Sequence, residues 1–137
     1  MTELEKQLND YVGRAHFMKD YCLSLVSAER GHVRLSAPVS QRILNNFGVV
    51  HGGFYMSISD TAAGLAALTD GRHYVTQNAS YQFLSNVTEG TVFLEATVLH
   101  CGKTVVSVRT EVFDASGKLL CEGLFSMFAV QKEFLPV

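Results

Sequence analysis

The sequence predicts an α+β fold in which a curved antiparallel sheet wraps around one central apolar helix. Two observations carry this prediction. Residues 54–68 form a run rich in alanine and leucine with the length of a buried helix. The second half of the chain, for example residues 105–112, alternates instead with the period of two that is typical of strands. A helix, a hairpin, a buried helix and four strands, in this order, fit a sheet that curves around the buried helix.

Length and composition are those of one domain with a sizeable core. The 137 residues fit a single domain over residues 1–137, and 47% of them are hydrophobic against 18% that are charged. The formal net charge is -2, and lysine and arginine form no tract. This charge pattern argues against a basic surface for nucleic acid.

No segment has the pattern of a targeting peptide or a membrane span. Residues 1–6 are charged and no apolar stretch follows them, unlike in a signal peptide. The central apolar run is interrupted by polar residues, unlike a membrane span. Three widely spaced cysteines, Cys22, Cys101 and Cys121, favour reduced thiols. We therefore expect a cytoplasmic protein, and the spacing of His and Cys residues predicts no metal site.

The first part of the chain should contain a helix and then a hairpin. Thr2 and Glu5 have the spacing of a capping box, and apolar residues recur after them at helical period. We expect this helix to run from Thr2 to about Phe17. Residues 38–50 look irregular. Before residue 38, composition predicts a hairpin. Its two strands are residues 22–28 and 33–37, and residues 29–32 form the turn between them.

Four long strands should follow the central helix, at residues 74–84, 92–99, 105–112 and 118–130. Residues that favour turns separate the last three strands, at Cys101-Gly102 and over residues 114–117. We expect strands that are neighbours in the sequence to pair, which would make the four an antiparallel meander.

The most informative stretch is His-Gly-Gly at 51–53, followed by Asp60 on the same apolar run. Between His51 and Thr69, Asp60 is the only formally charged side chain, and burying a lone carboxylate is unfavourable unless something compensates for it. The two glycines should open the helix, where unpaired N–H groups and a positive dipole face outward. The residues alone leave two interpretations of Asp60 open, namely catalysis and an N-cap within residues 59–61.

One motif connects these residues with a known family. The pattern Asn-x-x-Gly-x-x-His-Gly-Gly, with an Asp nine positions after the His, falls without a gap on Asn45, Gly48, His51, Gly52, Gly53 and Asp60. With this motif and its order of elements, the chain resembles hotdog-fold acyl-CoA thioesterases. The resemblance is to the branch of the 4-hydroxybenzoyl-CoA thioesterase superfamily that includes the phenylacetate-pathway thioesterase. The chain departs from the family over residues 85–87, where a proline often follows the strand.

The resemblance implies an enzyme that hydrolyses an acyl-CoA thioester to a carboxylic acid and free CoA. Asp60 would be the nucleophile or the general base that activates water. The Gly52 N–H would polarise the thioester carbonyl and stabilise the oxyanion. Asn45 would hold the attacking water or orient the thioester through its amide. Simpler interpretations exist, because glycines also permit a tight entry into a helix and Asn45 also favours a turn.

Four further residues take their expected roles from the same resemblance. His51 would organise the loop and the helix start through hydrogen bonds instead of carrying a proton, and Gly53 would contact the substrate beside Gly52. The Thr76 hydroxyl would assist the catalytic carboxylate or the water, although an ordinary strand threonine is nearly as good an interpretation. Lys103 would pair with a CoA phosphate, although a lysine at a hairpin end is more often only solvated.

The family builds each site from two chains, with the glycine N–H of one subunit facing the aspartate of the other. We therefore expect a homodimer or homotetramer that binds acyl-CoA and needs no redox or metal cofactor. Two other functions stay open. A non-catalytic acyl-CoA-binding module would keep the glycines without needing Asp60, and a dehydratase would pair a catalytic His with an acidic residue in a pattern absent here. The acyl group, whether aryl, short-chain or medium-chain, is also open.

Overall fold

The computed structural model describes residues 1–133. Two N-terminal helices come first, followed by a hairpin, a short 3₁₀ helix, a long helix and four long strands. Their bounds are α1 Glu3–Arg14, α2 His16–Asp20, β1 Ser24–Glu29, β2 His32–Pro38, η1 Gln41–Ile43, α3 Gly52–Leu68, β3 Arg72–Phe83, β4 Thr91–Cys101, β5 Val105–Phe113 and β6 Leu119–Glu133.

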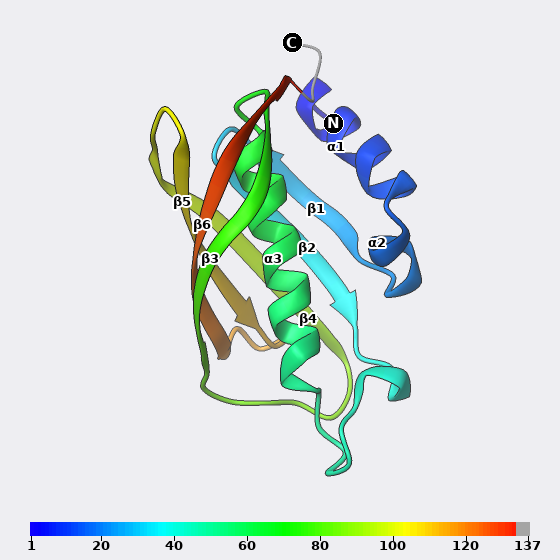
Figure 1. The fold of residues 1–137 in the computed structure, drawn as a ribbon. Coiled ribbons are helices and arrows are strands. Elements are labelled where there is room, and N and C mark those ends of the chain that lie inside the picture. Colours follow the sequence, from blue (N-terminus) through cyan, green and yellow to red (C-terminus); the bar gives the residue numbers. More distant parts are fainter. Residues whose placement is uncertain (134–137) are drawn as a thin grey trace.

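The six strands form one antiparallel sheet in the order β1-β2-β4-β5-β6-β3. Figure 1 shows α3 lying along the inside of this curved sheet, with α1 and α2 beside β1. An apolar helix inside a curved antiparallel sheet is the α+β hotdog architecture expected from the sequence, and that expectation is confirmed.

One part of the expected topology is wrong. β4, β5 and β6 form a meander, but β3 pairs with β6 at one edge of the sheet and does not pair with β4. The segment 84–90 instead carries the chain past the start of α3, where the Val50 N–H donates to the Val87 carbonyl and Asn86 Nδ2 donates to the Val50 carbonyl. Alternation determines which face of a strand is buried and not which strand lies beside it, so it could not reveal this crossover.

The first half of the chain follows the expected pattern with one correction. Thr2 and Glu5 form the capping box, since each side chain accepts the backbone N–H of the other residue. The first helix ends at Arg14 and does not continue to Phe17, which belongs to the separate helix α2. The β1–β2 hairpin is confirmed, and its turn contains Gly31 with a φ of 79°.

The core is built around α3, and one stripe of this helix stays open. Ten of its 17 residues are buried, including Ile58 and Leu65. Strand residues that point inward, such as Leu94 and Val108, are fully buried against it. An open stripe of exposed or half-buried residues follows one side of the helix. Its members are Gly53, Met56, Ser57, Asp60, Thr61 and Gly64.

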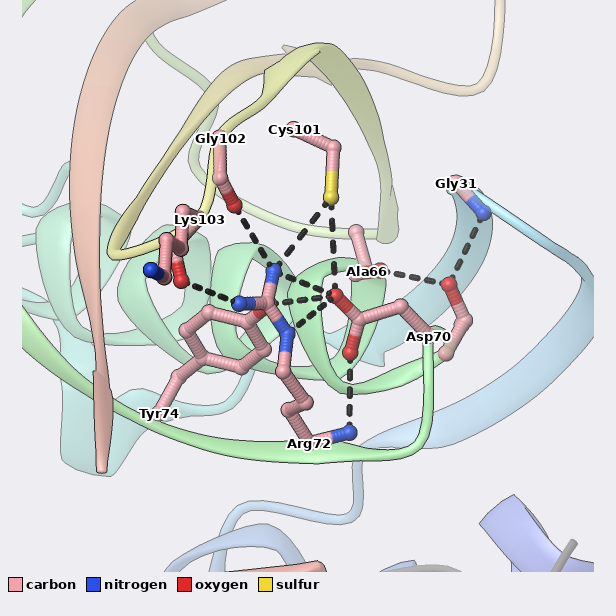
Figure 2. Close-up of polar contacts among 9 residues, drawn as sticks. Gly31, Ala66, Asp70, Arg72, Tyr74, Cys101, Gly102 and Lys103 are labelled. Atoms are coloured by element: carbon pink, nitrogen blue, oxygen red, sulfur yellow. Dashed lines mark hydrogen bonds and ion pairs between the residues drawn. The ribbon is translucent and has the colours of Figure 1, made fainter. Parts of the chain in front are cut away.

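A polar cluster attaches the end of α3 to the β1–β2 turn and to the start of β3 (Figure 2). Thr69 follows the helix, and its Oγ1 accepts the Gly31 N–H at 2.8 Å. The Asp70 side chain is only 10% exposed. It accepts hydrogen bonds from the Tyr74 hydroxyl and from the guanidinium of Arg72, the latter at 3.0 and 3.1 Å. An almost buried carboxylate is thus surrounded by donors that compensate for its loss of water.

Arg72 extends the cluster to the β4–β5 turn. Its guanidinium donates to the Lys103 carbonyl at 2.6 Å and to the Gly102 carbonyl at 3.0 Å. Burial alone would raise the pKa of Asp70, but the hydrogen bonds from Tyr74 and Arg72 outweigh burial and hold this pKa below its ordinary value. Burial and the bond to Asp70 raise the pKa of the Tyr74 hydroxyl, which therefore stays protonated as a donor.

The lowered pKa of Asp70 predicts a loss of stability in acid. The folded state binds fewer protons at this group than the unfolded state, whose pKa is about 3.9, so its contribution is complete above that value. It is lost as the pH falls through the folded pKa. Asp70→Asn should therefore unfold at a lower denaturant concentration than the wild type at pH 7, and the difference should shrink below pH ~4.

Urea unfolding from pH 7 to pH 3 measures this difference. Asp10→Asn, which makes the same chemical change on the exposed surface of α1, is the matched control and should differ little from the wild type at any pH. A difference for Asp70→Asn that stays constant across the range would contradict the assignment.

Candidate active site

α3 begins at Gly52, and the residue before it caps the helix. His51 has extended backbone dihedrals, φ -64° and ψ 131°, and its Nδ1 accepts the Gly53 N–H at 2.9 Å. A neutral ring that accepts at Nδ1 carries its proton on Nε2. The Gly53 N–H is therefore occupied within the chain and is not directed at a ligand.

The Gly52 N–H, by contrast, has no acceptor among residues 1–133. After Gly53, the N–H groups of Phe54 and Tyr55 both donate to the His51 carbonyl. The ring of Phe83 lies against Gly52, since a Cβ added to this glycine would come within 3.1 Å of Phe83 Cε1. One backbone donor is thus left at the positive end of the helix, beside an aromatic ring that is 55% exposed.

Asn45 lies in the loop before α3, and its side-chain oxygen is used inside that loop. Oδ1 accepts the Phe47 N–H at 2.9 Å and the Val49 N–H at 3.4 Å. Gly48, with a φ of 78°, completes the turn. The turn interpretation therefore accounts for the Asn45 oxygen. The amide nitrogen has no hydrogen-bond partner within the described part of the chain, so it is the atom that could donate to a substrate.

Asp60 lies in the middle of α3, eight residues after the helix start, so the N-cap interpretation of this residue is wrong. It is half-buried, and its Oδ1 accepts a hydrogen bond from Thr76 Oγ1 at 2.5 Å. Its other oxygen accepts no hydrogen bond from residues 1–133. The register of β3 shifts between Thr76 and Asn78, and a bulge of this kind commonly re-aims a side chain beside an active site.

A cavity of about 370 Å³ opens beside Asp60 and Thr76. Past these two side chains its walls are mainly apolar and come from α1, α2, α3, β3 and β6, at Tyr11, Phe17, Met18, Leu65, Leu68, Tyr74, Val75 and Met127, with His73 as a polar member. The sequence analysis missed the walls from α1 and α2. No local signal could have revealed them, because packing against a distant part of the chain creates this contact.

Gly52 and Asp60 cannot meet at one reacting atom within a single chain. Eight residues separate them on one helix, which corresponds to about 12 Å along its axis. A thioester carbonyl carbon that is within reach of the Asp60 carboxylate therefore lies far from the Gly52 N–H of the same chain.

Lys103 lies outside this site. Its side chain is exposed in the β4–β5 turn, and it borders a separate cavity of about 530 Å³ that is also lined by Arg72 and Phe128. Neither Asp60 nor Thr76 lines that cavity. Across the described residues, no three His, Cys, Asp or Glu side chains are arranged to hold a metal ion. None of the helices described here is long and apolar enough to cross a membrane.

Comparisons with known proteins identify the family of this chain. The family model of the thioesterase superfamily matches residues 47–121, more than half of the chain. A Saccharolobus solfataricus protein that is named as an esterase is 34% identical to this chain. The match covers 80% of this chain and 79% of the length of that protein.

Two solved structures share the architecture. The protein smu.793 of Streptococcus mutans, whose crystal structure has acetyl CoA bound, is 28% identical with a TM-score of 0.79, over 82% of this chain and 91% of its own. The E. coli PaaI protein from the phenylacetic acid degradation operon has a TM-score of 0.92 at 20% identity, over 96% of both chains. The expected resemblance and the expected class of enzyme, a thioester hydrolase, are thereby confirmed. This chain belongs to the thioesterase superfamily.

Proposed function

We propose that the protein hydrolyses acyl-CoA thioesters with Asp60 as the nucleophile or the general base. The observation that carries this proposal is the carboxylate of Asp60, which accepts from Thr76 on one oxygen and borders an apolar cavity. A carboxylate oriented on one side and open on the other can attack a carbonyl carbon, or can remove a proton from a water that does so. The cavity beside it offers a place for the acyl group.

The proposed electrophilic partner is the Gly52 N–H. It lies at the positive end of a buried helix, and a preorganised backbone donor stabilises the negative charge that develops on the carbonyl oxygen. His51 contributes by fixing the first turn through the Gly53 N–H, which is a positioning role. Asn45 would donate from its amide nitrogen to the substrate or to the attacking water.

Two chains are needed for this mechanism, because the helix holds Gly52 and Asp60 about 12 Å apart. β3 is a 12-residue strand at the edge of the sheet, and one of its sides pairs with no described strand. A long edge of this kind is a template for another strand. We infer that a twofold axis pairs β3 with its copy and brings the Gly52 of one subunit to the Asp60 of the other, in a homodimer or a homotetramer.

Acyl-CoA is proposed as the substrate because smu.793 was crystallised with acetyl CoA. A Streptococcus pneumoniae protein named as a hypothetical thioesterase offers a second parallel. Its structure was solved with one aspartate replaced by alanine and also with one threonine replaced by alanine. Those two residues are 16 positions apart, as are Asp60 and Thr76.

A pair of substitutions at Gly52 tests the oxyanion donor. Proline is well tolerated at the first position of a helix, and the extended backbone of His51 suits a residue that precedes proline. Gly52→Pro removes the N–H and places a Cβ against Phe83, whereas Gly52→Ala places the same Cβ there and keeps the N–H, so the comparison isolates the N–H. The proline variant should have a kcat about 10²- to 10³-fold below that of the alanine variant. Equal activity in two well-folded variants would exclude the Gly52 donor.

Asp60→Asn tests the carboxylate. The variant should lose roughly 10²-fold or more of kcat, because asparagine can still accept from Thr76 but is neither a base nor a nucleophile. Thermal unfolding and assembly should stay close to those of the wild type, since the side chain is half-buried and the change is isosteric. Turnover near the wild-type level would show that the Asp60 carboxylate is neither the nucleophile nor the general base, whereas a wild type that releases no thiol from any acyl-CoA would favour the non-catalytic acyl-CoA-binding module.

Mixing the two inactive variants tests whether the site is shared. A dimer of one Asp60→Asn chain and one Gly52→Pro chain has one intact site if the two groups come from different subunits. Random exchange should then restore about one quarter of the wild-type turnover per chain, because half of the dimers are mixed. No recovery after verified exchange would mean that each chain works alone.

Lys103 is proposed as a contact to a CoA phosphate. Lys103→Ala should raise KM a few-fold for an acyl-CoA and leave kcat nearly unchanged, because a contact shared by ground and transition states adds only binding. The matching acyl-pantetheine lacks the nucleotide phosphates and should show no effect. Lys118→Ala, at the exposed β5–β6 turn, is the matched control. An equal loss on both substrates would remove the phosphate assignment.

A further inference from the structure

Gly64 stands in the interior of α3, where glycine is unfavourable. It is four residues from the end of a 17-residue helix. Among residues other than proline, glycine is the least favourable in a helix interior, because it has the most backbone freedom to lose. A glycine at such a position usually has a packing or functional reason.

Packing within the described chain does not require this glycine. A Cβ added to Gly64 would have Met127 Cε as its nearest neighbour, at 3.9 Å, which is an ordinary van der Waals contact. Gly123 on β6 shows the opposite case, since a Cβ there would come within 2.5 Å of the Tyr81 ring. The space that a side chain at Gly64 would occupy is therefore open. The corresponding space at Gly123 is already occupied by other atoms of the protein.

The open space belongs to the cavity beside Asp60. Gly64 lines that cavity together with Asp60 and Thr76. Residues i and i+4 lie above one another on a helix, so the vacant position at Gly64 is one turn beyond the Asp60 carboxylate, about 6 Å along the axis. Past it the cavity continues between Leu65, Leu68 and the wall from α2.

We propose that Gly64 determines acyl specificity by leaving a passage from the reacting carbonyl into the apolar end of the cavity. This inference rests on the proposed thioester hydrolysis and specifies its substrate class. With carbon–carbon bonds of about 1.5 Å, a distance of about 6 Å corresponds to roughly four to five bonds. The substrates are therefore apolar acyl groups, aliphatic or aryl, that extend past the first four carbons.

Gly64→Ala tests the passage. The added methyl group should lower kcat/KM for octanoyl-CoA and phenylacetyl-CoA by about tenfold relative to acetyl-CoA, because one carbon in an apolar pocket discriminates to this extent. Comparing the octanoyl and phenylacetyl arms shows whether the distal pocket prefers a chain or a ring. Gly13→Ala is the matched control, since it makes the same change in a helix where the new Cβ meets nothing within 4 Å. It should leave the preference unchanged.

A second variant keeps the test decisive if Gly64→Ala loses activity altogether. Phe17 lines the cavity from α2, and Phe17→Leu should shift the preference in the opposite direction, toward bulkier acyl groups. A uniform change for all substrates in both variants overturns the proposal. A Gly64→Ala chain that fails to form the wild-type assembly, with unchanged acyl preference in Phe17→Leu, overturns it too, because the glycine then serves subunit contact.

Binding of S-alkyl-CoA thioethers, which cannot be hydrolysed, separates this inference from the proposed function. Calorimetry should show affinity rising with alkyl length in the wild type and levelling off earlier in Gly64→Ala. If the wild type shows this dependence but releases no thiol from any acyl-CoA, the hydrolase proposal fails and the passage stands. If it hydrolyses acyl-CoA but its affinity for the thioethers does not depend on alkyl length, the passage is refuted and the hydrolase proposal stands.

Discussion

The burial of α3 is the constraint on which the rest of the structure depends. This helix is too apolar to face water along most of its surface, and the inner face of the sheet is apolar as well, so each covers the other. The sheet must curve to surround the helix, and β3 has to reach its far side to do so. The open stripe that remains on α3 is the only part of the described helix where polar groups such as Asp60 reach solvent or a cavity.

One rigid helix also sets the spacing of the proposed chemistry. Its first residue offers a backbone donor, its middle offers a carboxylate, and the next turn offers empty space at Gly64. These three features keep their distances because one continuous α-helix carries all of them. Thr76, on β3, orients the Asp60 carboxylate by a hydrogen bond. Asn86, in the loop after β3, holds the chain just before the helix start through the Val50 carbonyl. In the proposed mechanism, catalysis and specificity are thus separated along one axis, so that either could change without rebuilding the other.

Much of this could be predicted from the sequence, for physical reasons that differ between elements. The capping box at Thr2 and Glu5, the glycines that open α3 and the turn at Gly31 are local signals, because neighbouring residues satisfy them. The pairing of β3 with β6 and the cavity wall at Phe17 are not local, since both depend on how distant segments pack. The polar cluster around Thr69, Asp70 and Arg72 was missed for the same reason, because Thr69 and Arg72 bind distant turns, at Gly31 and at Lys103.

The two hairpin turns of the second half also differ in what holds them. In the β5–β6 turn, Asp114 Oδ1 accepts from the N–H groups of Ser116 and Lys118, so the turn carries its own bonds. The β4–β5 turn has a backbone bond of its own, from the Gly102 N–H to the Val105 carbonyl, but its side-chain hydrogen bonds come from Arg72, some thirty positions earlier in the chain. The β5–β6 turn can therefore close early in folding, as soon as its own residues meet. The β4–β5 turn gains its bonds from Arg72 only after the start of β3 has docked beside it, so this second attachment is a late event.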